Sequence, residues 1–577
     1  MKKTVLCLAL LAAISAGSAA SAATALTGGK SVSLDGILAD AENAPAKNVM
    51  AYSGNSLYAS GNFDTPFGGM SPLTTGDAFI IKYSTGMVEQ WKVQLMGTAS
   101  VTTMVADDNG GIYVGGTFAD IVEMGSTDGN TQSIEGYQEA GVATVFKAAS
   151  FVAHYNAAGV LLGVGTVVPT HDPALDATGA YFPDAEYGDT QFALNKLLVS
   201  GGKLYGVGTL KGQITNAAAT ETATSGSYDA FGIGLYMPAT AGVVVEFGSD
   251  FTVSSIPVVA TGKTFADGLQ SAEEVVSMSA TASDSNLYVG FNSIGNIDVN
   301  VFGTKSTVDN PLSVDGGYNI AYTIMSIGLE AKESNIETFD IIHTNVDYIS
   351  TAINDMAVAD DNLIITGLFQ SSLGFDQSVN AVSSSDMYVV SLNAADLSLN
   401  WAKATGYNEG EATDYEETIT GSAILNDIAY IYGSNEQKSD RAKQASLFYS
   451  VNLADGTLES MNPEDYIFGM ASDGANIATA HTTVPVSGIT FTTYGEFASV
   501  NDIAAGKAQT MSVYPNPVAD VLRFSQPCNV KLYSLDGKQL LDATGTTALD
   551  VTGLGKGVYV VEMECDGETA HSKVLKK

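Results

Sequence analysis

A short motif that joins an aromatic residue to a glycine recurs along most of this sequence and limits its fold more than any other feature. Each copy has a polar turn, an apolar strand that carries an aromatic residue, and a glycine, often followed by a second aromatic residue. Seven copies can be recognised, the last two weaker than the others, and they start at Asn55, Gly110, Gly202, Ser285, Asp361, Ile428 and Asp473. Such self-similarity indicates a repeat architecture.

A second strand follows most copies of the motif. It alternates polar and apolar residues, and it occurs at Gly76–Tyr83, Ser150–Tyr155, Tyr228–Ile233, Ser385–Leu392 and Ser446–Val451. In two copies a tryptophan comes next, Trp91 or Trp401. Alternation with a period of two residues between Gly, Asp and Asn turns is the pattern of β-hairpins, so each repeat predicts about four strands.

Sheets of this size bury both faces when they stack around an axis, as the blades of a β-propeller do. The copies therefore predict an all-β propeller of six or seven blades, seven being slightly preferred, over residues 23–505. We expect the glycine-containing strand to lie closest to the axis. Uneven spacing places insertions in hairpin loops, for example over residues 125–149 and 169–189. Another multi-sheet all-β array remains the alternative.

The repeats over residues 45–495 loosely resemble bacterial surface propellers. Blades of those proteins carry a tyrosine–x–glycine–x–phenylalanine motif followed by aspartate–x–phenylalanine, as approximated here by Tyr113 to Thr117 and by Asp77 to Phe79. We also expect the short alternating strand Ser31–Leu34 to pair with Ile489–Tyr494. That pairing would close the ring and remove an exposed sheet edge.

Composition agrees with a β fold and excludes some functions. The chain has 577 residues, among them 60 glycines, 26 tyrosines and 22 phenylalanines. Its formal net charge is −38, and Arg441 and Arg523 are its only arginines. Because phosphate backbones are bound through lysine and arginine, nucleic-acid binding is excluded, and an anionic membrane surface is disfavoured for the same reason.

Residues 1–22 have the features of a cleavable secretory signal peptide. Lys2 and Lys3 precede an apolar run over residues 5–14, and Ala20-Ser21-Ala22 is a small-x-small cleavage site. The run is shorter than the roughly 20 residues that span a bilayer, so no membrane span is predicted. Cys528 and Cys565 remain after cleavage, and a disulfide between them and two buried free thiols are both compatible with the sequence.

No catalytic or metal-binding residue is predicted. The five histidines lack metal-ligand spacing, and His154 fits an ordinary strand position. The acidic turns Asp107–Gly110 and Asp360–Asn362 could hold calcium, but Asp and Asn are also what tight turns require, and we favour that interpretation. Trp91, Trp401 and other aromatic residues could stack on carbohydrate, but packing between blades is preferred. No cofactor is expected, with calcium left open.

Near residue 506 the composition of the sequence changes: residues 504–510 are small and polar and form a predicted linker at the start of a second domain. Two prolines bracket Asn516 in a rigid turn, and Asp-Gly pairs at 536–537 and 566–567 predict tight hairpins. The predicted strands are Met511–Tyr514, Val521–Phe524, Val530–Leu535, Lys538–Leu541, Ala548–Val551, Val558–Met563 and Ala570–Leu575. About seven short strands predict a small immunoglobulin-like β-sandwich over residues 506–577.

This segment closely resembles the type A C-terminal sorting domain of cargo proteins of the type IX secretion system in Bacteroidota. The residues that match its motifs are Tyr514, Pro515, Asn516, Pro517, Asp536, Gly537, Gly557, Tyr559, Lys573, Lys576 and Lys577. The resemblance implies periplasmic entry, recognition by the outer-membrane translocon and its sortase machinery, and release or attachment at the cell surface.

Together these features predict an exported propeller that binds a glycan or protein ligand. A broad face built of loops suits binding, and the sequence shows no catalytic constellation. A propeller enzyme acting on glycans, such as a lyase or hydrolase, is the alternative. A central cluster of two or three carboxylates facing an aromatic residue would favour it. A purely structural surface component is the third interpretation.

Overall fold

The computed structural model describes residues 30–35, 49–495 and 513–577, with internal gaps. The gaps are residues 64, 67–68, 74–75, 85, 137–148, 172–189, 230–233, 263–272, 311–317, 345–350, 383–384, 406–414, 438–439, 462–465, 483–487, 515–517, 535–537 and 566–567. Every regular element in the described residues is a β-strand. The predicted signal peptide lies outside the described residues. Contacts divide the chain into a larger unit that includes residues 89–491 and a smaller one that includes residues 492–577.

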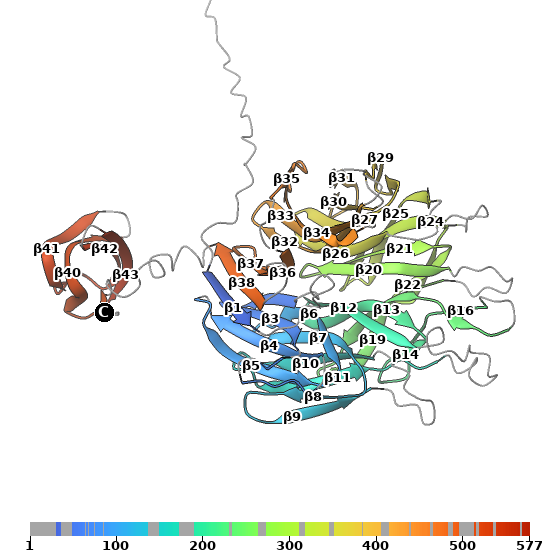
Figure 1. The fold of residues 1–577 in the computed structure, drawn as a ribbon, viewed down its shortest axis with the longest axis horizontal. Helices are drawn as coiled ribbons and strands as arrows, with labels where there is room; N and C mark the ends of the chain where they lie inside the picture. The colour runs from blue at the N-terminus through green and yellow to red at the C-terminus, as the bar shows by residue number, and fades with distance from the viewer. Residues whose placement is uncertain are drawn as a thin grey trace, which may run out of the picture. The chain divides into compact units, whose positions relative to one another are not determined.

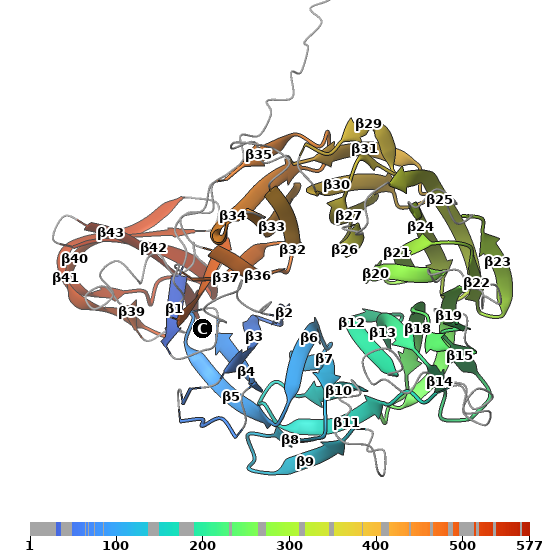
Figure 2. The same ribbon diagram turned by 45° about the vertical axis from the view of Figure 1, so that its right-hand side comes forward.

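The larger unit is a β-propeller, as the repeats predict. Seven of its described sheets have four or more strands, and Figures 1 and 2 show them arranged around an axis. We number them 1 to 7 by their innermost strands, which are β2 (Val49–Ser53), β6 (Ala99–Ala106), β12 (Gln191–Ser200), β20 (Glu274–Ala282), β26 (Ala352–Ala359), β32 (Tyr415–Leu425) and β36 (Tyr466–Ser472). Each innermost strand contacts the next one, and β36 contacts β2.

The other three strands of each sheet follow outward and are antiparallel to their neighbours in the described pairings. The second strands are β3 (Ser56–Phe63), β7 (Ile112–Phe118), β13 (Lys203–Lys211), β21 (Asn286–Ile294), β27 (Asn362–Phe369), β33 (Ile428–Gln437) and β37 (Asn476–Thr482). The third strands are β4 (Asp77–Ser84), β10 (Ala149–Tyr155), β18 (Ala241–Phe247), β24 (Tyr318–Gly328), β30 (Asp386–Asn393), β34 (Asp440–Asn452) and β38 (Gly488–Gly495). The fourth strands are β5 (Glu89–Met96), β11 (Leu161–Val167), β19 (Val253–Gly262), β25 (Glu333–Thr344), β31 (Leu399–Ala404), β35 (Leu458–Ser460) and β1 (Lys30–Asp35).

The N-terminal strand closes the ring, as predicted. Sheet 7 has the strand order β1-β38-β37-β36, so its outermost strand comes from the other end of the chain. The hydroxyl groups of Ser33 and Thr490 form a hydrogen bond of 2.9 Å between β1 and β38. Figure 2 shows the blue β1 beside the orange strands of this sheet.

Two expectations about the repeat were wrong. The aromatic-glycine motif forms the second strand of each sheet, and a separate, less patterned strand lies nearer the axis. In sheet 3 the predicted strand Tyr228–Ile233 does not supply the third strand: Ser227–Tyr228 (β16) pairs with Met237–Pro238 (β17) in an insertion, and residues 230–233 lie outside the described residues. The true third strand is β18, a nearly continuous buried apolar run. The strand was missed because the segment that starts at Tyr228 carries the Asp-x-Phe pattern of the other copies, whereas β18 does not.

Hairpins inserted after the second strand extend the preceding sheet, which the sequence did not reveal. The hairpin β8 (Ile121–Gly125) and β9 (Thr131–Glu135) belongs to sheet 2 by chain order but pairs with β5 of sheet 1. Likewise β22 (Ile297–Val301) and β23 (Thr304–Val308) follow β21 and pair with β19 of sheet 3.

Two shorter hairpins lie in the same position of the repeat. The hairpin β14 (Gln213–Thr215) and β15 (Thr222–Thr224) exchanges two backbone hydrogen bonds with Thr170, just after β11 of sheet 2. Between β28 (Ser372–Leu373) and β29 (Asp376–Asn380), the ring of Phe375 lies 4.7 Å from that of Phe339 in β25. In each case a hairpin covers part of the outer edge of the preceding sheet.

The large aromatic residues pack between sheets, in agreement with the interpretation preferred from the sequence. Tyr58, Tyr155 and Tyr388 are fully buried. The indole nitrogen of Trp91 donates to the carbonyl of Ala157 in the next sheet at 3.1 Å. Trp401 makes the equivalent bond to Leu453, also at 3.1 Å.

The smaller unit has five described strands, fewer than predicted. They are β39 (Val513–Tyr514), β40 (Val521–Ser534), β41 (Gln539–Asp550), β42 (Gly557–Cys565) and β43 (Glu568–Lys576). In β40 and in β41, two predicted strands are joined into one, because a break in the pairing register bends the chain without ending the strand. The two Asp-Gly hairpins are present in the register, although their turn residues lie outside the described residues. An immunoglobulin-like arrangement stays a prediction.

Candidate functional site

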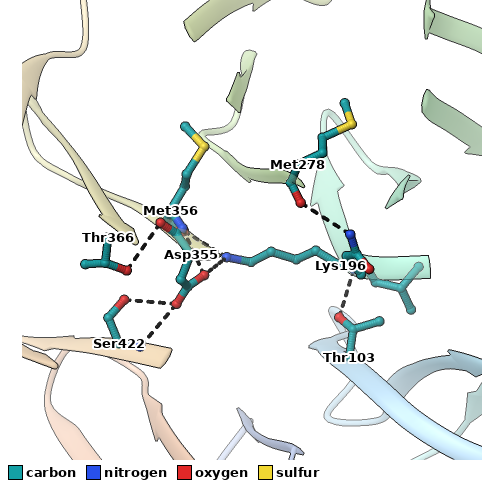
Figure 3. Close-up of polar contacts among 9 residues, drawn as sticks. Thr103, Lys196, Met278, Asp355, Met356, Thr366 and Ser422 are labelled. Carbon is teal, nitrogen blue, oxygen red and sulfur yellow. Dashed lines mark hydrogen bonds and ion pairs between the residues drawn. The ribbon is translucent and has the colours of Figure 1, made fainter. Parts of the chain in front are cut away.

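The inner face of the propeller carries a polar cluster whose position depends on β-bulges. The pairing register shifts between Leu194 and Lys196 in β12, between Ile353 and Asp355 in β26, and between Ile419 and Gly421 in β32. Each bulge adds a residue to the innermost strand and turns the next side chain. Lys196 and Asp355 come immediately after two of these breaks, Ser422 follows Gly421 after the third, and the three side chains come together as shown in Figure 3.

The glycines of the repeated motif make these bulges feasible. Gly208 and Gly367 lie on the second strands, opposite the bulges of β12 and β26. A Cβ atom at Gly208 would collide with the carbonyl oxygen of Ala193, and one at Gly367 with that of Ala352. The motif that defines the repeat therefore also shapes the strand beside it.

An ion pair connects two sheets that are not neighbours. The Nζ atom of Lys196 donates to Oδ1 of Asp355 at 2.5 Å and to the carbonyl oxygen of Met356 at 2.8 Å. Oδ2 of Asp355 accepts the hydroxyl of Ser422 at 2.9 Å. The side chains of Lys196 and Asp355 keep 27% and 20% of their surface exposed, so both remain accessible to solvent. Sheets 3, 5 and 6 are thereby linked.

Neutral contacts fix the strands around this ion pair. The hydroxyl of Thr103, which follows the bulge of β6, accepts the backbone N–H of Leu197 at 2.8 Å. The hydroxyl of Ser277, which follows the bulge of β20, accepts the N–H of Ile353 at 2.7 Å. A residue that follows a bulge thus repeatedly binds the next innermost strand. This network holds the charged pair in a rigid frame.

A cavity of about 500 Å³ lies beside the ion pair. Its lining includes Lys196, Asp355 and Asp360 together with hydroxyl groups from Thr281, Ser422 and Ser472. The volume is within the range of small-ligand sites. Among the described residues, the lining holds two carboxylates and no aromatic side chain, and Lys196 and Ser422 already bind Asp355. The cavity therefore offers one ammonium group, two carboxylates and several hydroxyls to a polar ligand.

In the first acidic turn, Asp107–Gly110, the carboxylate of Asp107 stabilises the turn itself. Oδ1 of Asp107 accepts the N–H groups of Asn109 at 2.8 Å and Gly111 at 2.5 Å, while Oδ2 lies 2.7 Å from Nε2 of His154. Burial raises the pKa of Asp107, but the bonds from His154 and the two N–H groups outweigh it and lower the pKa overall. His154 stacks on Tyr113 with ring centroids 4.3 Å apart.

The second acidic turn has no convergent carboxylates. Asp360 adopts a left-handed backbone with φ of 50°, and the carbonyl of Asp361 accepts the N–H of Ala394 at 2.9 Å. The amide oxygen of Asn362 accepts the hydroxyl of Ser391 at 3.0 Å. No group of three or more His, Cys, Asp or Glu side chains suited to a metal occurs among the described residues. Calcium binding stays an untested prediction.

In the smaller unit, strand pairing places the residue that follows the first sorting motif beside the C-terminal lysines. Val518, directly after the predicted Pro-Asn-Pro turn, forms a parallel bridge with Lys576. Its N–H donates to Leu575 at 2.8 Å, and its carbonyl accepts the N–H of Lys577 at 3.0 Å. Gly557 pairs with Lys576 on the other side. Three described motif segments, at Tyr514, at Gly557 and at Lys573–Lys577, therefore contribute to one sheet.

Residues 512–577 match the family described as the secretion system C-terminal sorting domain. The chain carries a type IX secretion sorting domain. Its presence implies that the protein interacts with that secretion machinery and is exported to the cell surface or secreted. No helix long and apolar enough to cross a membrane occurs in the described parts of the chain.

Several motif residues of the sorting domain have defined positions. Tyr514 pairs with Arg523 in the β39–β40 ladder, and the hydroxyl of Tyr559 donates to the carbonyl of Gly555 at 2.8 Å. Lys573 is exposed on β43, whereas Lys576 is only 9% exposed. Pro515, Asn516, Pro517, Asp536 and Gly537 lie outside the described residues.

The sorting domain also contains a disulfide-bonded cysteine. Cys528 forms a disulfide and lies in the core with Leu532, Val561 and Met563. The β40–β42 register pairs Asn529 with Glu564, so the backbone of Cys565 lies next to that of Cys528. Of the two arrangements left open by the sequence, the register favours a bridge that joins these two strands.

Comparison with solved structures finds other propellers at low similarity. The Dos1 propeller has a TM-score of 0.38 and 8% identity, over 81% of this chain and 95% of that chain. The β-propeller domain of the Trilobed protease from Pyrococcus furiosus has a TM-score of 0.35 and 7% identity, over 77% and 93%. Trypanosoma rangeli sialidase has a TM-score of 0.30 and 9% identity, over 94% and 89%. A search of curated proteins found no match.

Proposed function

We propose that this cargo of the type IX secretion system is a non-enzymatic binding protein whose propeller holds a glycan or protein ligand outside the cell. In this proposal, the translocon recognises the sorting domain, and the sortase machinery removes it before the propeller is released or attached at the surface. The sorting domain directs export, and the inner cavity binds the ligand.

The observation that supports binding is the partly exposed ion pair of Lys196 and Asp355 beside a cavity of about 500 Å³. A polar ligand can accept a hydrogen bond from the Lys196 ammonium group and donate one to a carboxylate of the lining. The surrounding strands are fixed by hydrogen bonds from Thr103 and Ser277. A preorganised frame lowers the entropy that binding costs.

The same cavity gives less support to a glycan-cleaving enzyme. Such an enzyme needs a carboxylate that is free to act as an acid, a base or a nucleophile, usually in a pair. Asp355 is held by Lys196 and Ser422, and none of the described residues that line the cavity is an aromatic on which a sugar ring could stack. Binding is therefore the function that the described geometry supports best.

The test is to screen the purified full-length protein against glycans and extracellular proteins, with and without calcium. We expect Lys196→Met and Asp355→Asn to weaken binding by about tenfold or more, since each removes a charge-assisted hydrogen bond. Lys92→Met, which breaks the surface pair with Glu89, is the matched control and should bind normally. Unchanged binding by both cavity variants would contradict the site. Turnover of a bound glycan would favour the enzyme.

A further inference from the structure

A second cavity, distinct from the inner one, lies where the β22–β23 hairpin meets sheet 3. It has a volume of about 650 Å³, and we call it the outer groove. Its walls come from the start of β13, the end of β18, from β19 and from the β14–β15 hairpin, together with the tip of the β22–β23 hairpin and the β24–β25 turn. Elements of sheet 3 and two turns from the following repeat therefore converge on it.

Phe302 at the hairpin tip has an unfavourable backbone for its residue type. Val301 pairs with Thr304, so Phe302 and Gly303 form a two-residue turn, with φ of 47° and 88°. A turn with two positive φ angles favours Asn, Asp or Gly at its first position, and a bulky residue there is an outlier. Strain of this kind is often retained at functional sites.

The ring of Phe302 is held in place on the groove wall. Its backbone N–H donates to the carbonyl of Pro257 at 2.8 Å, which ties the hairpin tip to β19. The Nζ atom of Lys332 lies 5.4 Å from the ring centroid, and the ring remains only partly buried. The groove thus presents an aromatic surface that is fixed in position and accessible from the cavity.

Hydrogen-bonding groups surround Glu246 across the groove. Lys203 donates to Oε1 of Glu246 at 2.8 Å, and the hydroxyl of Ser255 lies 3.4 Å from Oε2. Burial and the nearby Glu246 carboxylate raise the pKa of Tyr205 to about 12, so its hydroxyl stays protonated and able to donate. An oxygen of Glu221 accepts the N–H of Ile256 at 2.5 Å.

The charges in the groove balance, although the chain as a whole has a net charge of −38. Lys203 and Lys332 oppose Glu221 and Glu246 in the lining. A polyanion would be repelled by the whole molecule and would meet two carboxylates in the groove. An uncharged ligand with many hydroxyls, and with one apolar ring face to pack on Phe302, satisfies both the polar groups and the aromatic surface.

We propose that the outer groove binds an uncharged oligosaccharide, with one sugar ring packed on Phe302 and its hydroxyls bound by Glu246 and Lys203. This site goes beyond the proposed function, because it is separate from the inner cavity and can be tested independently of it.

The test uses the full-length protein and isothermal titration calorimetry with neutral tetrasaccharides of glucose, mannose and xylose. Phe302→Asn removes the ring but supplies a residue that the turn favours, so its melting temperature should be unchanged or higher. Its affinity should fall by about tenfold or more, and Glu246→Gln should show a similar loss. Lys92→Met, which breaks the surface pair with Glu89, is the matched control and should bind these sugars normally.

Four results would overturn the proposal. The first is the absence of binding by every neutral tetrasaccharide up to about 10 mM, the weak limit of specific recognition. The second is normal sugar binding by Phe302→Asn. The third is loss of sugar binding only in Lys196→Met, which would place the ligand in the inner cavity and support the proposed function there. Preference for a sulfated tetrasaccharide or for peptides would also contradict the assignment.

Discussion

Single residues in the repeated motif act through the strand beside them. Gly208 and Gly367 leave room for carbonyl oxygens of the innermost strands, and those strands bulge there. The residues after the bulges, Lys196 and Asp355, then meet across the inner face. A larger residue in place of either glycine would displace the bulge, and with it the ion pair.

The contribution of Asp107 to the stability of the fold depends on whether its carboxyl group is ionised. Its folded-state pKa is lowered from the ordinary 3.8, so it stabilises the fold above that pH, and the stabilisation is lost as the pH falls through the lower folded value. We expect Asp107→Asn to lower the free energy of unfolding by roughly 1–2 kcal/mol at pH 5 and by less at pH 3. Urea unfolding at both pH values measures this.

The neighbouring Asp108 supplies the control for this measurement. Asp108 is exposed at the tip of the same turn, so Asp108→Asn should retain the pH dependence of the unchanged protein. An equal loss of stability at pH 5 and pH 3 in Asp107→Asn would show that ionisation of Asp107 is not involved.

Among the strands and hairpins, the recurring feature is protection of sheet edges. The hairpins β8–β9 and β22–β23 pair with the outermost strands of the preceding sheets, and β1 covers β38. An unpaired edge would offer free N–H and C=O groups to another chain. Insertions that look irregular in the sequence therefore have a regular position in the fold.

Removal of β1 tests the closure of the ring. A chain that begins at Val49 lacks β1 and leaves β38 as an uncovered edge, whereas a chain that begins at Lys30 retains the pairing. We expect the shorter chain to lose roughly 2–5 kcal/mol of stability, because several ladder hydrogen bonds at about 1 kcal/mol each are removed. Calorimetry should show a lower melting temperature than for the chain that begins at Lys30. Equal melting temperatures would mean that β1 does not contribute to closure.

For the whole molecule, the sorting domain and the propeller have separate tasks. The motifs of the sorting domain form one folded sheet in which Val518 and Lys576 are adjacent. We therefore expect recognition of this domain to require its fold as well as its terminal residues. The apolar side chains of Leu575 and Val558 pair on this sheet and are 43% and 39% exposed.

Removing residues 510–577 should leave a folded propeller in the periplasm, because the machinery no longer has a domain to recognise. Removing Lys573–Lys577 should have the same effect, since it deletes the end of β43 and its bridge to Val518. Leu575→Glu changes an exposed side chain and keeps the backbone pairing, so it separates recognition from folding. Cell fractionation with immunoblotting measures the distribution. Normal surface display of the chain lacking residues 510–577 would refute the sorting role.

Local sequence patterns determined the all-β class, the second strand of every sheet and the sorting domain. These depend on neighbouring residues: alternation buries one face of a strand, and Asp-Gly pairs favour tight turns. The pairing of β1 with β38 was also predictable, because both are short alternating strands at the ends of the repeats. The third strand of sheet 3 was missed, because the inserted segment that starts at Tyr228 carries the Asp-x-Phe pattern of the other copies and β18 does not.

Only the tertiary structure decided which residues form the candidate sites. Lys196 and Asp355 are 159 residues apart in sequence, and they meet because bulges in two innermost strands turn them toward each other. Phe302 reaches the outer groove because its hairpin pairs with the preceding sheet. A bulge or a hairpin crossing between sheets is set by packing among distant strands, which leaves little mark on the local sequence.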